Sequence, residues 1–240
     1  MKASVSDQRS ILDIQKFDLQ SATLRNKAAT LPELAELTST TIKQNNVRDL
    51  RIAAETELSD VKRELARAEG DVEQIVTRIE RDEKRLASGT GTPKELEQTQ
   101  HELATLATRR AELEEVELEI MMRVDGIKER ITVLSTEENE LAAVIADLNI
   151  RKENALAAVH TELEGIEVDR KATTQSVGAE ILALYEKIRE ANNGIGAAAL
   201  AGNQCKGCNL TLNTIELQRI AGLGADEVVR CEECRCILVR

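Results

Sequence analysis

The sequence predicts a mainly α-helical protein, in which a long antiparallel coiled-coil hairpin is followed by a small C-terminal module built around cysteines. Ala, Leu, Glu, Lys and Arg make up 121 of the 240 residues, a composition typical of coiled coils and long helices. Apolar residues recur with a period of seven, and four of the five cysteines form two C-x-x-C pairs. With one Phe, one Tyr and no Trp, a large α/β enzyme or an all-β protein is not expected.

The first two helices are expected over about residues 5–29 and 31–88. Thr30 to Glu33 reads Thr-x-x-Glu, which is typical of a helix start. Pro32 stands in that first turn, and a proline inside a continuous helix would remove a hydrogen bond and clash with the preceding turn. The second helix has coiled-coil spacing in Leu58, Val61, Leu65, Ala68, Val72, Ile75, Ile79 and Leu86.

Residues 88–95 are expected to form the tip of the hairpin. Two glycines end the preceding helix, and Thr92 is then a natural N-cap. Pro93 suits the first helical position, and Glu95 completes a capping box. Because the loop is short, the helices on either side should run antiparallel.

The third helix is expected over residues 93–191, with bends where Gly165 and Gly178 interrupt it. One seam row is complete: Leu106, Leu113, Ile120, Ile127, Leu134, Leu141 and Leu148. The companion row contains Arg110, Glu117 and Glu138, which are interpreted as residues that fix the register. Folding the chain about the tip pairs Val61 with Ile120 and places Gln44 opposite Glu138 as a polar layer.

The helical domain, residues 1–191, is predicted to end at an Asn-Asn-Gly-Ile-Gly segment, and a second domain follows over residues 192–240. The join contains no Gly-Lys-Ser/Thr and follows no strand, so it is not a phosphate-binding loop. Within the second domain a short helix is expected over 214–221, with strands on both sides of it.

The two C-x-x-C pairs are the clearest chemical feature of the chain. Each pair can hold one metal ion from a tight turn, and two pairs complete a tetrahedron of thiolates. The sequence therefore predicts a zinc ribbon with one structural Zn(2+). Its ligands would be Cys205, Cys208, Cys231 and Cys234.

Catalysis at this site is not expected, and the protein is predicted not to be an enzyme. Four thiolates leave no open position for water, and no βαβ pattern surrounds either pair to suggest thioredoxin-like redox chemistry. Cys236 is interpreted as a small apolar strand residue, with an alternative ligand or redox-sensitive thiol as the other hypotheses. His101 and His160 are expected to be solvated on the rod.

The distribution of apolar residues predicts a cytoplasmic protein that does not bind membranes. No apolar run approaches the ~18 residues of a membrane span, and the first 20 residues lack the apolar core of a signal peptide. In a reducing compartment, clustered cysteines indicate metal ligands rather than disulfides. The net charge of −11 repels nucleic acid at long range.

A family resemblance covers essentially the whole chain. The tip sequence TGTPKELEQTQHEL and the pairs CKGC and CEEC resemble the bacterial C4-type zinc-ribbon family with a long N-terminal coiled-coil hairpin. The resemblance implies a non-enzymatic adapter or chaperone, with relatives linked to transcription through an alternative sigma factor and to flagellar or secretion machinery. It also implies the same four cysteine ligands. Where the family usually has Gly-Arg after the last pair, this chain has Arg235-Cys236.

Three functions follow as hypotheses. The leading one is a protein adapter that binds a partner protein through both the rod and the ribbon, with no small-molecule substrate. The alternative is RNA or DNA binding through the ribbon, which carries basic residues near the knuckles: Lys206, Arg219, Arg230, Arg235 and Arg240. The third hypothesis is a structural spacer set by the length of the rod.

Overall fold

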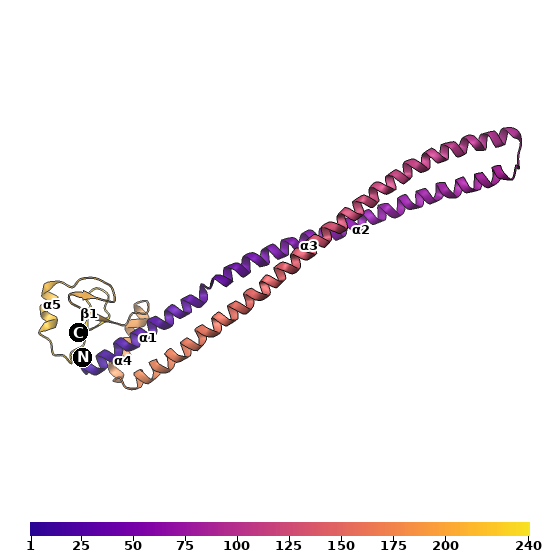
Figure 1. The fold of residues 1–240 in the computed structure, drawn as a ribbon. Coiled ribbons are helices and arrows are strands. Elements are labelled where there is room, and N and C mark those ends of the chain that lie inside the picture. The colour runs from indigo at the N-terminus through magenta and orange to yellow at the C-terminus, as the bar shows by residue number, and fades with distance from the viewer. The chain divides into compact units, whose positions relative to one another are not determined.

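The computed structural model describes residues 1–240 and confirms the mainly α-helical fold with a long helical hairpin (Figure 1). The helices are α1 (Val5–Ala29), α2 (Pro32–Ala87), α3 (Pro93–Gln175), α4 (Ala179–Ala191) and α5 (Thr214–Ala221). The strands are β1 (Ala197–Ala201), β2 (Gln204–Cys205), β3 (Val229–Arg230) and β4 (Ile237–Val239). By their contacts, residues 35–148 form one compact unit, and residues 1–34 with 149–240 form a second. The predicted boundary at residue 191 falls inside the second of these units.

The unit of residues 35–148 is an antiparallel pair of helices contributed by α2 and α3. Its best-buried apolar residues are Ala54 and Val61 of α2 with Val124 and Ile127 of α3. Residues of both predicted seams pack around them: Leu58, Leu65, Ile120, Ile131 and Leu134. Because each helix of the pair packs against only one other helix, its buried residues form a single stripe, as the seven-residue period predicts.

Glu138 forms a polar contact across this pair, but with partners other than the predicted Gln44. Its carboxylate accepts hydrogen bonds from Arg48 Nε at 2.9 Å and from Arg51 Nε at 2.7 Å. These arginines lie one and two turns beyond Gln44 along α2. Their long side chains reach across the seam and neutralise the carboxylate, whereas a glutamine could only form a hydrogen bond with it. The hydrogen bonds from Arg51 and Arg48 lower the pKa of Glu138.

The tip between α2 and α3 has the predicted capping box. The Thr92 backbone N–H donates to Glu95 Oε2 at 2.7 Å, and the Glu95 backbone N–H donates to Thr92 Oγ1 at 3.4 Å. Gly89 and Gly91 have φ values of 62° and 143°, which non-glycine residues rarely adopt. The two glycines therefore permit the reversal, and the capping box starts α3.

The junction of α1 and α2 differs in detail from the prediction. Thr30 ends α1 instead of starting α2: its backbone N–H and its hydroxyl both donate to the carbonyl oxygen of Asn26, at 3.0 and 2.8 Å. Leu31, the residue that follows Thr30, is buried, and α2 begins at Pro32. The helix break at the proline is as predicted, but Thr30 caps the preceding helix.

The helix predicted over residues 93–191 is divided in two. Helix α3 ends at Gln175 and α4 begins at Ala179, with Gly178 as the N-cap. In the turn between them, the Ser176 N–H donates to the Thr173 carbonyl at 3.1 Å. The turn directs Val177 into the apolar core of the second unit, where it is 8% exposed. Burial of this side chain accounts for a complete break where the sequence suggested only a bend.

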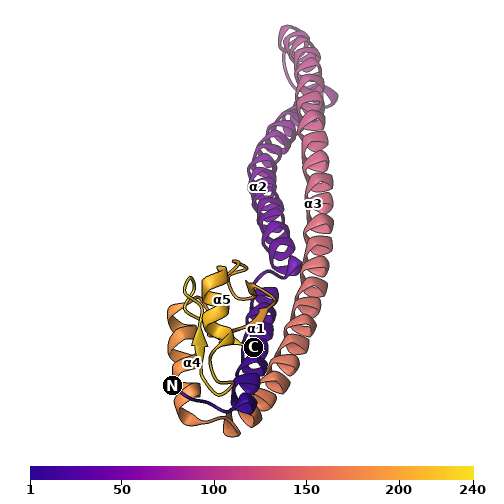
Figure 2. The ribbon, with the colours of Figure 1, turned by 90° about the vertical axis from the view of Figure 1, so that its left-hand side faces the viewer.

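The second unit packs α1 and α4 against a four-stranded sheet of order β2-β1-β4-β3 (Figure 2). Strands β1 and β4 are parallel, and the two outer pairs are antiparallel. Ile11 and Ile14 of α1 are fully buried with Tyr185 of α4 and Ile237 of β4. The N-terminal helix and α4 thus share a core with the module that contains the cysteines.

None of the helices combines the length and apolar character that a bilayer crossing requires.

Candidate metal centre

The two C-x-x-C pairs have the same backbone structure. In the first pair, the Cys205 N–H donates to Leu210 O at 3.0 Å, and the Asn209 N–H donates to Cys205 O at 2.8 Å. In the second, the Cys231 N–H donates to Cys236 O at 2.9 Å, and the Arg235 N–H donates to Cys231 O at 3.0 Å. Each pair is therefore a tight turn that holds both of its sulfurs on one side.

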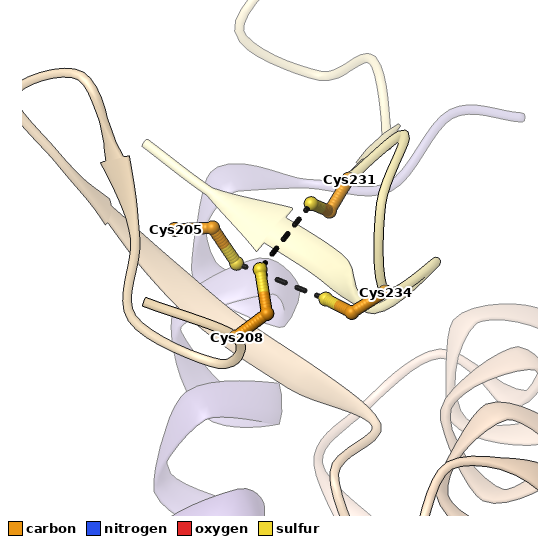
Figure 3. Close-up of side chains that lie close together, drawn as sticks. All are labelled: Cys205, Cys208, Cys231 and Cys234. Carbon is orange, nitrogen blue, oxygen red and sulfur yellow. Dashed lines mark hydrogen bonds between the residues drawn. The ribbon is translucent and has the colours of Figure 1, made fainter. Parts of the chain in front are cut away.

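The four predicted cysteines converge (Figure 3): all four Sγ atoms lie within 4.8 Å of one another. Cys205 and Cys234 are 3.9 Å apart, as are Cys208 and Cys231. A tetrahedral ion with metal–sulfur bonds of about 2.3 Å places its sulfurs about 3.8 Å apart. These residues could therefore hold one metal ion. Each of the two close sulfur pairs takes one cysteine from each turn.

The chemistry of the donors also fits a cation. Cys205 and Cys231 are buried, and the other two cysteines are half-buried. Burial raises the pKa of the Cys234 thiol to about 12, because a thiolate loses its hydration there. A divalent ion reverses this preference, since thiolates are its ligands and its charge compensates theirs. The ion that suits four soft sulfurs in a closed tetrahedron is zinc or iron.

Cys236 lies beside this group without belonging to it. Its sulfur is 3.2 Å from Cys234 Sγ and 3.7 Å from Cys205 Sγ, and the residue is fully buried. It packs in an apolar cluster with Ile220 and Leu238. Burial raises the pKa of this thiol as well. The surroundings are those of a small core residue, and whether Cys236 can replace a ligand stays a prediction.

Three of the five basic residues of the nucleic-acid hypothesis, Lys206, Arg219 and Arg240, are engaged within the chain. Arg219 is paired with Glu216 at 2.5 Å. Lys206 Nζ donates to Gln204 Oε1 at 2.6 Å. The Arg240 guanidinium donates at 2.6–3.3 Å to four backbone carbonyls, those of Ile220, Leu223, Gly224 and Glu227. Arg240 therefore ties the C-terminal residues to the last turn of α5 and to the loop after it.

Gln15 of α1 connects the first helix to the start of the sheet. Its side chain is buried, and Nε2 donates to the Gly194 carbonyl at 2.9 Å. Its Oε1 accepts from the backbone N–H groups of Gly196 at 2.6 Å and Ala197 at 3.1 Å. Since β1 pairs with β2, which carries Cys205, α1 helps to position one candidate ligand. No local pattern in the sequence indicates this contact.

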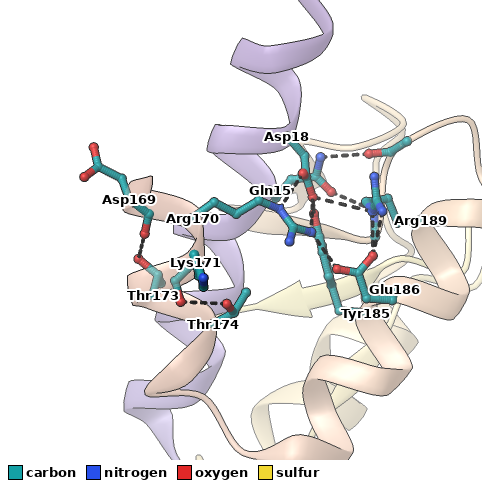
Figure 4. A network of polar contacts seen from close by, with 12 residues as sticks. Gln15, Asp18, Asp169, Arg170, Lys171, Thr173, Thr174, Tyr185, Glu186 and Arg189 are labelled. Atoms are coloured by element: carbon teal, nitrogen blue, oxygen red, sulfur yellow. Dashed lines mark hydrogen bonds and ion pairs between the residues drawn. The ribbon is translucent and has the colours of Figure 1, made fainter. Parts of the chain in front are cut away.

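A second cluster that the sequence did not predict joins α1, α3 and α4 around Asp18 (Figure 4). The Asp18 carboxylate accepts from Arg170 Nε at 2.7 Å and from the Tyr185 hydroxyl at 2.6 Å. Glu186 accepts from Arg170 and from Arg189 at 2.5 and 2.8 Å. Burial and then the bond to Asp18 raise the pKa of Tyr185. The phenol therefore stays a hydrogen-bond donor at neutral pH.

Replacing Asp18 by alanine is expected to destabilise this unit by about 2–3 kcal/mol, because Arg170 and Tyr185 each lose a charge-assisted hydrogen bond. Tyr185 fluorescence during urea unfolding measures the change, since the chain has no other tyrosine and no tryptophan. Asp13→Ala is the matched control, because Asp13 is exposed on the same helix. Equal unfolding midpoints for the two variants would contradict the role given to Asp18.

The fold and the site together define a class: proteins with a long coiled-coil hairpin and a small sheet region that carries a four-cysteine cluster. The family model described as the CT398-like coiled coil hairpin domain matches residues 14–193. The chain belongs to this family.

Relatives match over the full length of the chain. The uncharacterised protein Rv2229c of Mycobacterium tuberculosis is 34% identical, over all of this chain and 98% of its own. A solved structure from Mycobacterium smegmatis is 30% identical, with a TM-score of 0.89 and full coverage of both chains. The structure of CT398 from Chlamydia trachomatis is 18% identical, with a TM-score of 0.68 over 97% of this chain and 96% of its own, and shows the fold alone.

Proposed function

We propose that the protein is a non-enzymatic, cytoplasmic adapter or chaperone that binds a protein partner through its coiled coil and its cysteine module. We infer that the four cysteines hold one structural zinc ion. A closed set of four sulfurs leaves no position for a substrate or a water nucleophile. Elemental analysis of the purified protein distinguishes about one zinc per chain from iron, and absence of both metals would contradict this assignment.

The observation that carries the proposal is an exposed apolar surface on α3. Leu118 is 58% exposed and Met122 is 68% exposed, although both are large and apolar. They are four residues apart and so lie on one face of the helix, together with Met121, which is 45% exposed. Clustered apolar surface on a solvent-facing helix is typical of a protein-binding site, and methionine adapts to varied partners.

Affinity capture from the native cell tests the proposal. The wild-type chain is expected to enrich a protein partner, and Leu118→Glu with Met122→Glu is expected to weaken that enrichment at least tenfold. Exposed Ala107→Glu adds negative charge elsewhere on α3 and serves as the control. If the wild-type chain enriches nothing, the adapter function is refuted. If the double variant captures the partner normally, the binding surface lies elsewhere.

A further inference from the structure

A recess of about 440 Å³ lies between α4 and the second cysteine turn. Three basic side chains line it, those of Lys187, Arg230 and Arg235, with Glu233 as the only acidic one. Leu184 and Ile188 of α4 supply an apolar part of the lining. The recess is therefore locally positive in a chain whose net charge is −11.

These three cations are not neutralised within the chain. Lys187, Arg230 and Arg235 form no ion pair, unlike Arg219, which is bound to Glu216. Arg230 Nε donates to the Arg235 backbone carbonyl at 3.0 Å, so the Arg230 side chain is held beside the recess with other guanidinium N–H groups to spare. Positive charges that converge on one recess without partners attract an anionic ligand.

The backbone of Arg235 strengthens this argument. Its φ is 62°, in the left-handed region that favours glycine or asparagine. The equivalent position of the first cysteine turn is occupied by Asn209, with a φ of 59°. An arginine at such a position is unfavourable for the backbone. A function of its side chain, which lines the recess, accounts for its presence.

The lining also discriminates between anionic partners. No aromatic side chain lines the recess to stack a nucleic-acid base. Apolar Leu184 and Ile188 beside the cations suit a ligand that is both acidic and apolar. We propose that the recess binds an acidic amphipathic segment of the protein partner, whose carboxylates pair with Arg230 and Arg235. This inference rests on the adapter function.

Fluorescence anisotropy tests the recess with a short fluorescein-labelled helical peptide of glutamates and leucines. The full chain is expected to bind this peptide, and Arg235→Gly is expected to weaken binding about tenfold or more, since charge-assisted hydrogen bonds are lost. Glycine suits the left-handed backbone, so this variant should fold. Arg219→Gln is the control, because it also removes one positive charge but lies outside the recess.

Four results would overturn the inference. They are no binding of the peptide by the wild-type chain, equal binding of a peptide with glutamine for glutamate, no effect of Arg235→Gly, and Arg235-dependent binding of an RNA oligonucleotide in place of the peptide. Capture of the native partner distinguishes failure of the recess proposal from failure of the adapter function. If Arg235→Gly retains the partner fully, the binding role of the recess is refuted and the adapter function stands. If the wild-type chain captures nothing, the adapter function itself fails.

Discussion

Replacing Cys231 by serine is expected to abolish metal binding and to unfold the small sheet. Structural zinc contributes of order 10–16 kcal/mol to small zinc modules, which is comparable with the whole stability of a typical domain. The module has few large apolar residues to replace that contribution, and Cys231 itself is 1% exposed. Elemental analysis is expected to give less than about one tenth of the wild-type zinc content.

The loss should extend beyond the sheet into α1 and α4. Ile237 and Val239 of β4 are buried in one cluster with Ile11 of α1 and Tyr185 of α4. When the sheet unfolds, Ile237 and Val239 leave this cluster, and the Tyr185 ring becomes exposed to water. A chelator should therefore change Tyr185 fluorescence, while most of the helical circular dichroism persists because residues 35–148 have their own core.

Cys236→Ala is the control for the metal prediction. Cys236 is as deeply buried as Cys231 and also carries a sulfur, but it lies outside the four-cysteine group. Its variant is expected to keep the wild-type metal content. Loss of zinc in Cys236→Ala, or a full metal content in Cys231→Ser, would show that the ion is held by a different set of sulfurs.

The features that the sequence predicted correctly depend on residues close together in the chain. The capping box at Thr92 and Glu95 spans four residues, and the seam of the hairpin repeats every seven. Each C-x-x-C pair likewise lies within one turn. Periodicity and spacing report such local geometry directly, so the hairpin and each cysteine turn could be predicted. The convergence of the two turns, in which Cys205 and Cys234 are 29 positions apart, could be predicted because one ion requires four ligands.

The contacts that the sequence did not reveal join distant residues. Asp18 and Tyr185 are separated by 167 positions, and Gln15 and Gly196 by 181. Neither Asp18 nor Gln15 belongs to a motif, and polar residues in a charge-rich helix are expected to face solvent. The packing of α1 against α4 and the sheet could not be deduced, because Ile11 and Ile14 could equally well have packed on another helix.

At Arg235, the family resemblance indicated an unusual residue but gave no physical reason why a glycine is expected there. The resemblance to the C4-type zinc-ribbon family implied a glycine directly after the last C-x-x-C pair, and the φ of 62° at Arg235 is a backbone conformation that suits glycine. The resemblance identified the departure. Only the structure relates it to the left-handed backbone, to the matching Asn209 in the other turn, and to the recess that the arginine side chain lines.

Gly196→Ala is expected to destabilise the second unit by about 3 kcal/mol, the upper end of what overpacking of a core usually costs. A Cβ at this position would lie 2.5 Å from Tyr185 Cδ2 and 2.8 Å from the Tyr185 carbonyl oxygen. The ring is fully buried and the carbonyl belongs to the backbone, so neither can move away at low cost. Urea unfolding followed by Tyr185 fluorescence measures the change.

The same substitution should also weaken metal binding, because Gly196 lies where the chain enters the sheet. Its N–H donates to Gln15, and its carbonyl accepts from the Ile237 N–H at 2.9 Å. Displacing it shifts β1, and with it the partner strand that carries Cys205. Gly165→Ala is the control: its added Cβ meets nothing within 4 Å, so the variant should be neutral or up to ~1 kcal/mol more stable. If both variants unfold alike, the packing of Tyr185 on Gly196 has no role in joining the helices to the sheet that carries the four cysteines.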